Sequence, residues 1–411
     1  MTNFMKGLAM TNNEVIKAKI DEYFDRTVAW RTYLHENPEV SDREYKTAEY
    51  LKKECEKLGL IVEDIANTTG FTALLDTGKS GKTLGIRTDI DALPILESEN
   101  NLKNKKTVVS KNKGVSHACG HDSHMATLLT TAKILTDFKD ELSGKIYFIF
   151  EEGEETGGGI DAMVEHLKDK DLDACYGNHQ LPFLEVGQIK VLKGPSHAGC
   201  AGVEFDVIGK GGHGSRPDKC INPLTATANI VTALTTAWVN QLDVSKTVTF
   251  GLGSINGGTA SNVIPDRCNV KGTLRFFDDK AGEDALKVLK EVVNTTARAH
   301  KCYVEFSDYT RIVAYPTIND PDLAEKVITS LNDIYPTSFL DGNPTYGSES
   351  FFGYSKLCPS VYTKFGVRDE KNGISAGSHT PEFDINPEGI KYAVGLQVKF
   401  ALDFLKGAFD D

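Results

Sequence analysis

The chain has 411 residues and a formal net charge of −12. This length exceeds what one hydrophobic core usually serves, so we expect two domains of unequal size. The acidic balance argues against a nucleic-acid partner, because clustered lysine and arginine hold a phosphate backbone. No apolar run reaches the roughly 20 residues that cross a bilayer, and residues 1–10 lack the apolar stretch of a secretory signal. The eight cysteines are scattered along the chain, which favours reduced thiols and a cytoplasmic protein without a membrane partner.

Two amphipathic stretches near the start of the chain predict helices over residues 13–34 and 41–58. In the second stretch, Ser41 and Glu44 fit a capping box, and Gly59 stands where a left-handed C-terminal residue is wanted. His35 follows the first stretch and is expected to be a structural cap.

The segments that follow alternate between extended and helical patterns. Residues 97–113 are polar and predict an exposed loop or hairpin. Short apolar runs predict strands at residues 71–75, 84–88 and 145–150, with a helix near residues 123–138. This order predicts an α/β domain, in which a mixed sheet is covered by helices.

The pattern changes after about residue 200, and this change predicts an inserted domain. We expect the first part of the main domain at residues 1–198, a smaller α+β insert at 199–311 and the return of the main domain at 312–411. The expected elements of the insert are strands at 203–208, 247–252 and 269–276 and helices near 222–239 and 281–299. A last helix near residues 387–405 belongs to the main domain.

Residues 117–124 read His-Ala-Cys-Gly-His-Asp-Ser-His. The side chains of His117, Cys119, His121, Asp122 and His124 offer nitrogen, sulfur and oxygen ligands for a borderline-soft divalent ion. Taken singly, a free cysteine packs as a small apolar side chain, and a histidine more often forms an ordinary hydrogen bond. Their crowding into eight positions predicts a metal site on a loop that enters a helix.

More candidate ligands follow the predicted strands. Ligands of open α/β sheets usually bind at the carboxyl ends of the strands, so these side chains are expected to converge. Adjacent carboxylates are often only a solvated charge run, but here they follow an apolar strand directly and precede a glycine loop at residues 157–159. The candidates are Asp89, Asp91, Glu151, Glu152, Glu154, Glu155, His179 and, near the end of the chain, His379.

Ordered motifs along nearly the whole chain resemble those of one enzyme family. They are RTYLHENPE at 31–39, RTDIDALP at 87–94, HACGHDSH at 117–124, EETGGGIDAM at 154–163, GNHQLP at 177–182, GKGGHGSRP at 209–217, NVIPD at 262–266, GTLR at 272–275 and SHTPEF at 378–383. The sequence is similar to the amidohydrolase branch, subfamily D, of metallopeptidase family twenty. This branch includes hippurate hydrolase, auxin-conjugate amidohydrolase, aminobenzoyl-glutamate hydrolase and N-acetyl-diaminopimelate deacetylase, and it implies a zinc-exopeptidase-like fold.

The resemblance implies a role for each matching position. Two divalent ions, zinc or manganese first and cobalt or nickel next, would be held by Cys119, His121, Glu155, His179 and His379. Glu154 would be the general base and Asp91 a supporting residue. His213 would stabilise the oxyanion from the insert, which acts as a lid and dimerisation domain, while Asn262 and Arg275 would contact the substrate. His117 and His124 would at most orient a ligand.

The implied activity is hydrolysis of the amide of an N-acyl amino acid or small dipeptide-like substrate by a homodimer or higher homo-oligomer. A broader aminopeptidase or dipeptidase is the alternative, and so is a noncatalytic metal-binding protein of the same fold.

Two segments depart from the family pattern. Residues Glu151, Glu152 and Gly153 stand where relatives have Gln-Pro-Ala, which adds two carboxylates near the metals, and the segment 194–202 contains His197 and Cys200 in place of small and apolar residues.

Overall fold

The computed structural model describes residues 11–410, so the expectation about residues 1–10 lies outside the described part of the chain. The chain forms two compact units. Unit 1 comprises Met1–Gly194, Asn319–Asn343 and Gly353–Asp411, and unit 2 comprises Pro195–Ile318 and Pro344–Phe352. Among residues 11–410, no helix is both long and apolar enough to span a membrane.

Unit 1 is built on one mixed sheet with the order β1-β2-β4-β3-β5-β17-β6-β16. Its strands are β1 (Ile61–Asp64), β2 (Phe71–Asp76), β3 (Thr83–Asp89), β4 (Lys145–Glu151), β5 (Ala174–Glu185), β6 (Ile189–Lys190), β16 (Phe339–Leu340) and β17 (Ser360–Arg368). The central strands β4, β3, β5 and β17 run parallel, whereas β1 and β2 pair antiparallel at one side. The central strands β3 and β4 are buried along nearly their whole length, as expected for a sheet covered on both faces.

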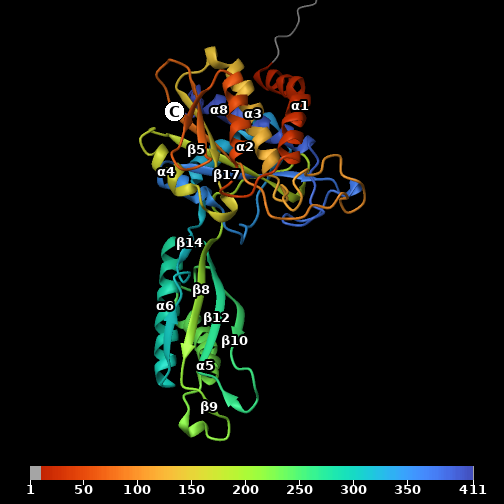
Figure 1. Ribbon diagram of the computed structural model, residues 1–411. Helices are drawn as coiled ribbons and strands as arrows, with labels where there is room; N and C mark the ends of the chain where they lie inside the picture. Colours follow the sequence, from red (N-terminus) through yellow and green to blue (C-terminus); the bar gives the residue numbers. More distant parts are fainter. Residues whose placement is uncertain (1–10, 411) are drawn as a thin grey trace, which may run out of the picture. The chain divides into compact units, whose positions relative to one another are not determined.

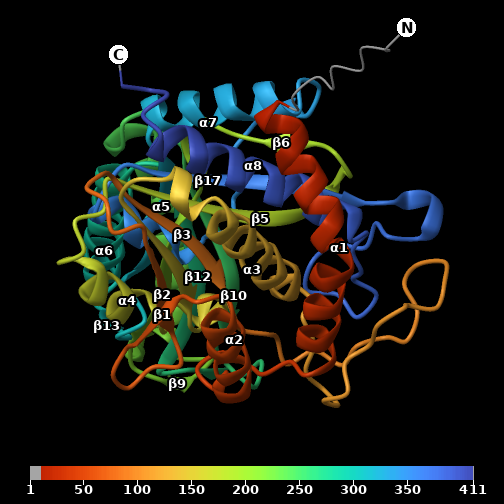
Figure 2. The ribbon, with the colours of Figure 1, turned by 90° about the horizontal axis from the view of Figure 1, so that it is seen from above.

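Helices of unit 1 cover this sheet, and Figure 2 shows α1, α3 and α8 lying side by side, with α7 next to α8. The helices are α1 (Asn12–Glu36), α2 (Tyr45–Lys57), α3 (His121–Asp137), α4 (Ile160–Leu167), α7 (Pro321–Ile334) and α8 (Glu388–Leu405). Apolar side chains of α3, α8 and the central strands form one continuous core. The sheet and its helices confirm the predicted α/β class.

The predicted capping box of the second helix is wrong. Helix α2 begins at Tyr45, and Glu44 precedes it without any side-chain cap bond. Ser41 donates instead to Asp91 Oδ2 over 2.7 Å, and the buried Glu44 accepts hydrogen bonds from Thr69 and from the backbone N–H of Gly153. Long-range partners have therefore replaced the local cap.

Unit 2 is a two-layer α+β structure, labelled in Figure 1 by β8, β10, β12, α5 and α6. Its main sheet has the order β10-β12-β8-β13, with β14 also paired to β8, and a small ladder joins β9 to β11. The elements are β8 (Gly199–Ile208), β9 (Gly212–His213), β10 (Val248–Asn256), β11 (Val263–Ile264), β12 (Arg267–Phe276), β13 (Tyr303–Phe306), β14 (Ile312–Ala314), α5 (Pro223–Gln241) and α6 (Asp279–Ala299). Two short strands, β7 (Gly194–His197) and β15 (Thr317–Asn319), lie where the chain passes from one unit to the other.

Alternation along β8 explains the layering of unit 2. Ala201, Val203, Phe205 and Val207 are buried against α5 and α6. The residues between them face the other side, where Glu204 pairs with Lys271 of β12. An antiparallel sheet with one covered face has this pattern.

Candidate metal centre

The segment with the dense histidines forms a tight turn into α3. Gly120 precedes the helix with φ +78°, and a Cβ at this position would lie 2.6 Å from the side chain of Gln180, so glycine is required on both counts. Gln180 Nε2 donates to the Cys119 carbonyl over 3.0 Å. Cys119 thus lies at the start of α3, directly before His121, which is the first residue of the helix.

The ends of β3 and β4 and the middle of β5 bring further side chains to the same place. Strands β3 and β4 are parallel and pair Asp89 with Glu151, so the residues that follow them emerge together. Asp91 follows β3, whereas Glu154 and Glu155 lie in a short 3₁₀ helix after β4. His179 comes from β5, which is paired with β3 on its other side.

His379 joins the group from a distant segment of unit 1. It adopts the left-handed backbone conformation with φ +64°, which is unfavourable for a residue with a Cβ. Its N–H donates to the carbonyl of Ala118 over 2.8 Å, next to Cys119. Its Nε2 lies 3.1 Å from Glu155 Oε1.

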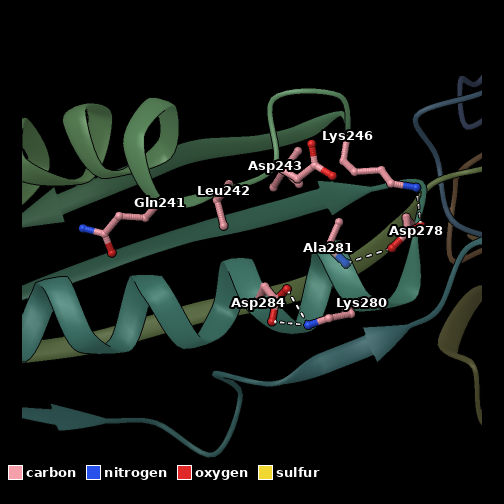
Figure 3. Close-up of a pocket in the computed structure, with 9 residues that line it drawn as sticks. Gln241, Leu242, Asp243, Lys246, Asp278, Lys280, Ala281 and Asp284 are labelled. Atoms are coloured by element: carbon pink, nitrogen blue, oxygen red, sulfur yellow. Dashed lines mark hydrogen bonds and ion pairs between the residues drawn. The ribbon is translucent and has the colours of Figure 1, made fainter.

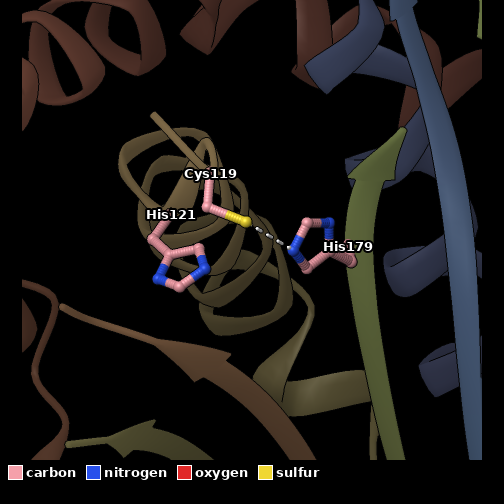
Figure 4. A group of neighbouring side chains, drawn as sticks. All are labelled: Cys119, His121 and His179. Atoms are coloured by element: carbon pink, nitrogen blue, oxygen red, sulfur yellow. Dashed lines mark hydrogen bonds between the residues drawn. The ribbon is translucent and has the colours of Figure 1, made fainter. Parts of the chain in front are cut away.

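These residues form overlapping groups in which the ligand atoms lie within 4.8 Å of one another. Figure 4 shows Cys119, His121 and His179 converging, with the thiol 3.4 Å from His179 Nε2. Two further groups share Glu155: one is Cys119 with Glu155 and His379, and the other is His121 with Glu154 and Glu155. A fourth group is Asp89 with His121 and His124. The structure therefore brings together all five ligands and the base implied by the resemblance, although their roles stay predictions.

The hydrogen bonds of the histidines leave free the atoms that a metal ion would use. His121 Nδ1 lies 3.0 Å from both Asp91 Oδ1 and the Asp91 carbonyl, and His179 Nδ1 lies 2.5 Å from the Gln180 carbonyl. The Nε2 atom of each ring is therefore directed to the other candidate ligands, and that of His179 contacts the Cys119 thiol, as in histidines that bind metal. His121 Nε2 and Glu155 Oε1, 3.9 Å apart, are buried and form no hydrogen bond, and the nearest cationic group to Glu155 Oε1 is His379 Nε2 at 3.1 Å. Such orphaned acceptors are rare in folded proteins, so this donor set fits divalent cations.

Burial and charge set the protonation of this group in the absence of a cation. Burial raises the pKa of the Cys119 thiol, so the sulfur needs a nearby cation to become a thiolate ligand. Burial also acts to raise the pKa of Asp91, but the hydrogen bonds with His121 and Ser41 outweigh it and lower the pKa. Asp91 Oδ2 accepts in addition from the Glu155 N–H over 3.0 Å. Asp91 therefore orients one candidate ligand by its side chain and another by its backbone.

His117 and His124 differ in their surroundings. His124 Nε2 accepts from the Gln180 N–H over 2.9 Å, so its Nδ1 carries the proton and donates to Asp89 over 2.7 Å. Both nitrogens of His124 are occupied, which leaves none for a metal ion. His117 is buried, and neither of its ring nitrogens has a hydrogen-bond partner.

The two additional glutamates belong to other contacts. Glu151 is fully buried and accepts from Arg87 Nε over 2.9 Å and from the Tyr354 hydroxyl over 2.5 Å. Glu152 is directed to Thr69, and burial raises its pKa. Neither residue belongs to a group with metal-ligand geometry among the described residues.

The other predicted functional residues lie in unit 2. His213 and Asn262 are brought together by the β9–β11 ladder, where the Gly214 N–H donates to the Asn262 carbonyl over 2.7 Å. The Ser215 N–H donates to His213 Nδ1, so the proton of this exposed imidazole is on Nε2. Arg275 lies farther along β12, opposite Cys200, and donates to Ser348 Oγ over 3.4 Å.

Unit 2 also has a hollow near the start of α6, drawn in Figure 3. Its charged side chains are paired locally: Lys246 with Asp278, and Lys280 with Asp284. Asp278 also caps α6 by accepting from the Ala281 N–H. These contacts account for the charges as ordinary surface pairs.

Some residues around the candidate centre carried no sequence signal. Lys364 of β17 is buried and lies in register with His179 of β5. The expectation for His35 is wrong, because its ring bridges Asp122 and Glu97 and does not cap the helix. Only the pairing of distant segments reveals these contacts.

Comparisons with known proteins agree with this geometry. The chain matches the model of peptidase family M20/M25/M40 over residues 85–403. It is 32% identical over 397 residues to thermostable carboxypeptidase 2 of Saccharolobus solfataricus, which covers 95% of this chain and 98% of the relative. It is 35% identical over 298 residues to N-acyl-L-amino acid amidohydrolase of Geobacillus stearothermophilus, which covers 72% of this chain and 79% of the relative.

A similar crystal structure is that of the YXEP protein of Bacillus subtilis, described as a dinuclear metal-binding peptidase of the M20 family. The TM-score is 0.80 at 26% identity, and the match covers 94% of this chain and 99% of the other. These matches confirm the family resemblance seen in the motifs, and the candidate ligand groups support two divalent ions. The chain belongs to peptidase family M20/M25/M40 and is a metal-dependent amidohydrolase.

Proposed function

We propose that this amidohydrolase removes the acyl group from N-acyl amino acids or small dipeptide-like compounds, with Glu154 as general base. The observation that carries the proposal is a pair of buried acceptor atoms without a hydrogen bond, His121 Nε2 and Glu155 Oε1, which lie among the other candidate ligands. Relatives differ in their names, since one is a carboxypeptidase and another an N-acyl-L-amino acid amidohydrolase. An unblocked peptide is therefore the competing substrate class.

The proposed ligands are Cys119, His121, Glu155, His179 and His379. Bound divalent cations supply a Lewis acid and a water acidic enough to lose a proton near neutral pH. Glu154 is the neighbour of Glu155 and shares its group with His121, which suits it to accept that proton. Glu154 then returns the proton to the departing amine. Zinc or manganese is the proposed metal, with cobalt or nickel as alternatives.

Unit 2 is proposed to complete the site as a lid, with His213 as donor to the oxyanion. Its Nε2 carries the proton because Nδ1 accepts from Ser215, so the ring is prepared to donate a hydrogen bond. Asn262 and Arg275 are the proposed substrate contacts. The exposed amide of Asn262 and the half-buried guanidinium of Arg275 suit a substrate carboxylate.

We also propose that the protein is a cytoplasmic homodimer that self-associates through unit 2. Strand β10 is an edge of its sheet among the described residues, and exposed edges are templates for pairing. An apolar hollow beside it is lined by Val231, Leu234, Thr235, Trp238, Phe250 and Leu252. All eight cysteines are unpaired, which suits a reducing compartment.

The test is amine release from N-acetyl, N-benzoyl and aminobenzoyl amino acids and from unblocked dipeptides. Metal-stripped protein is resupplied with zinc, manganese, cobalt or nickel before each assay. Metal-dependent cleavage of blocked substrates supports the proposal. Cleavage restricted to unblocked dipeptides would identify a peptidase instead.

The neighbouring glutamates provide a matched pair of variants. Glu154→Gln is expected to keep its metal content and lose about 10²- to 10⁴-fold in kcat, because the amide cannot accept a proton. Glu155→Gln is expected to lower the metal content, because Glu155 is a proposed ligand. The roles are reversed if Glu154→Gln loses metal while Glu155→Gln retains it.

A further inference from the structure

A chain of buried charged side chains connects α1 with the segment that carries His379. Arg31 Nε donates to Asp122 Oδ2 over 2.6 Å, and the same oxygen lies 2.9 Å from His35 Nδ1. The other nitrogen of His35 lies 2.9 Å from Glu97 Oε1. All of these side chains belong to unit 1, and Asp122 directly follows His121.

Lys106 extends this chain toward His379. Its Nζ donates to Glu97 Oε1 over 2.9 Å and to the Pro381 carbonyl over 3.0 Å. The side chain of Lys106 is 1% exposed and that of Glu97 is 5% exposed. Burial acts to raise the pKa of Glu97, but the hydrogen bonds with His35 and Lys106 outweigh it and hold the pKa at about 2. The ammonium therefore faces a carboxylate on one side and a backbone carbonyl on the other.

The Pro381 carbonyl is held from two sides, because it also accepts from the Ser98 N–H over 3.0 Å. Pro381 is only two residues beyond His379, which has a strained backbone with φ +64°. A strained conformation persists only where its surroundings hold it. The Ala118 carbonyl fixes the His379 N–H, and Lys106 and Ser98 fix the chain just after it.

We propose that Lys106 is a positioning residue for the metal centre: anchored by Glu97, it fixes the Pro381 carbonyl and so holds the His379 imidazole in place to bind a divalent ion. This inference rests on the proposed assignment of His379 as a ligand. In this proposal Lys106 acts through the Pro381 carbonyl and is itself neither a metal ligand nor a substrate contact. Its contribution is to reduce the freedom of one ligand, and residues that orient ligands typically change metal affinity by about 10- to 100-fold.

The same loop offers a matched control for Lys106. Lys103 also donates from its ammonium to a backbone carbonyl of the later segment, that of Glu370, over 2.6 Å. That carbonyl is nine residues before His379, and Lys103 is exposed. Replacing either lysine by methionine thus removes one ammonium-to-carbonyl bond between the same two segments, but only one of the bonds lies beside His379.

The test measures zinc content after dialysis and zinc affinity by competition with a chelator, using the full chain. Lys106→Met is expected to bind one of its two ions about 10- to 100-fold more weakly, whereas Lys103→Met keeps both ions at unchanged affinity. Lys106→Arg is expected to recover part of the affinity, because the guanidinium can still donate to Glu97 and Pro381. Folding is monitored by thermal unfolding of the zinc-free proteins. If Lys106→Met does not fold, Glu97→Gln serves instead, because it weakens the anchor without emptying the space.

His379→Ala separates this inference from the proposed function. If His379→Ala loses one zinc ion while folded Lys106→Met keeps both at unchanged affinity, the positioning role is overturned and the ligand assignment stands. If His379→Ala keeps both ions, the ligand assignment itself fails, and the role of Lys106 fails with it. Equal zinc loss in Lys106→Met and Lys103→Met would also overturn the inference, because the effect would then belong to the loop in general.

Discussion

The two units hold themselves together by different means. In unit 1, Arg87, Asp89 and Glu151 are fully buried in the middle of the sheet and bonded to one another. In unit 2, the sheet and its two helices enclose apolar side chains, and Arg267 forms its ion pairs at the surface. Buried charges cost much desolvation energy, so a fully apolar core is the simpler way to be stable. The unit with the costly interior is the one that contains the candidate metal centre.

Removing one arginine from each unit tests most directly whether ion pairs matter more for the stability of unit 1 than for that of unit 2. Arg87→Met should destabilise unit 1 by about 3 to 5 kcal/mol, because two buried carboxylates lose their partner. Arg267→Met should cost unit 2 less than about 1 kcal/mol, since its pairs are half exposed and screened by solvent. Urea unfolding followed by hydrogen exchange of β3 and β12 amides reports the two units separately. Similar losses in both variants would contradict the distinction.

A cavity in the apolar core tests whether the stability of unit 2 is independent of the metal centre. Leu289 of α6 is fully buried, and Leu289→Ala should destabilise unit 2 by about 3 kcal/mol. Lys287→Ala on the exposed side of the same helix should change it by less than about 0.5 kcal/mol. Metal content, measured by elemental analysis, should stay at the wild-type value in both variants. A loss of metal in Leu289→Ala would show that the centre depends on the packing of unit 2.

The polar interior should also give unit 1 a particular pH dependence. Burial raises the pKa of Glu44 from 4.5 to about 7. Between these values the folded state keeps a proton that the unfolded state has lost, so stability falls as the pH rises. Glu44→Gln should remove about 2 kcal/mol of this fall, as measured by urea unfolding at several pH values. Glu49→Gln, an exposed change on the helix that follows Glu44, should leave the pH profile close to wild type. An unchanged profile in Glu44→Gln would mean that Glu44 is ionised in the folded protein.

Much of the architecture could be predicted because its determinants are local. The first helix was expected over residues 13–34 and extends over Asn12–Glu36, since its apolar residues recur at helical spacing. Gly59 has φ +79° at the end of α2, as its position indicated. Ser41 and Glu44 had the correct spacing for a cap, but their side chains found partners in Asp91, Thr69 and Gly153. The prediction of a cap from local sequence was wrong because both side chains form hydrogen bonds with residues distant in the sequence.

The residues of the candidate metal centre also differ in how far the local sequence could predict them. Cys119 and His121 are recognisable because they lie two positions apart in a dense cluster. His179 and His379 were candidates from their places along the chain, but their role as ligands came from the family motifs, because strand pairing and a left-handed turn bring them to the cluster. Lys106 had no signal, because its surroundings contain several other lysines and only the fold selects the one that is buried.

The differing burial of the cysteine thiols would allow selective labelling of the protein. Seven of the eight cysteines are buried, and Cys220 is the partly accessible one. Its sulfur lies next to Gly212 in the strand that carries His213. A maleimide dye should therefore react first at Cys220 and label the neighbourhood of the proposed oxyanion donor without any engineered cysteine. Fluorescence from that single position would follow this part of unit 2 as substrate binds.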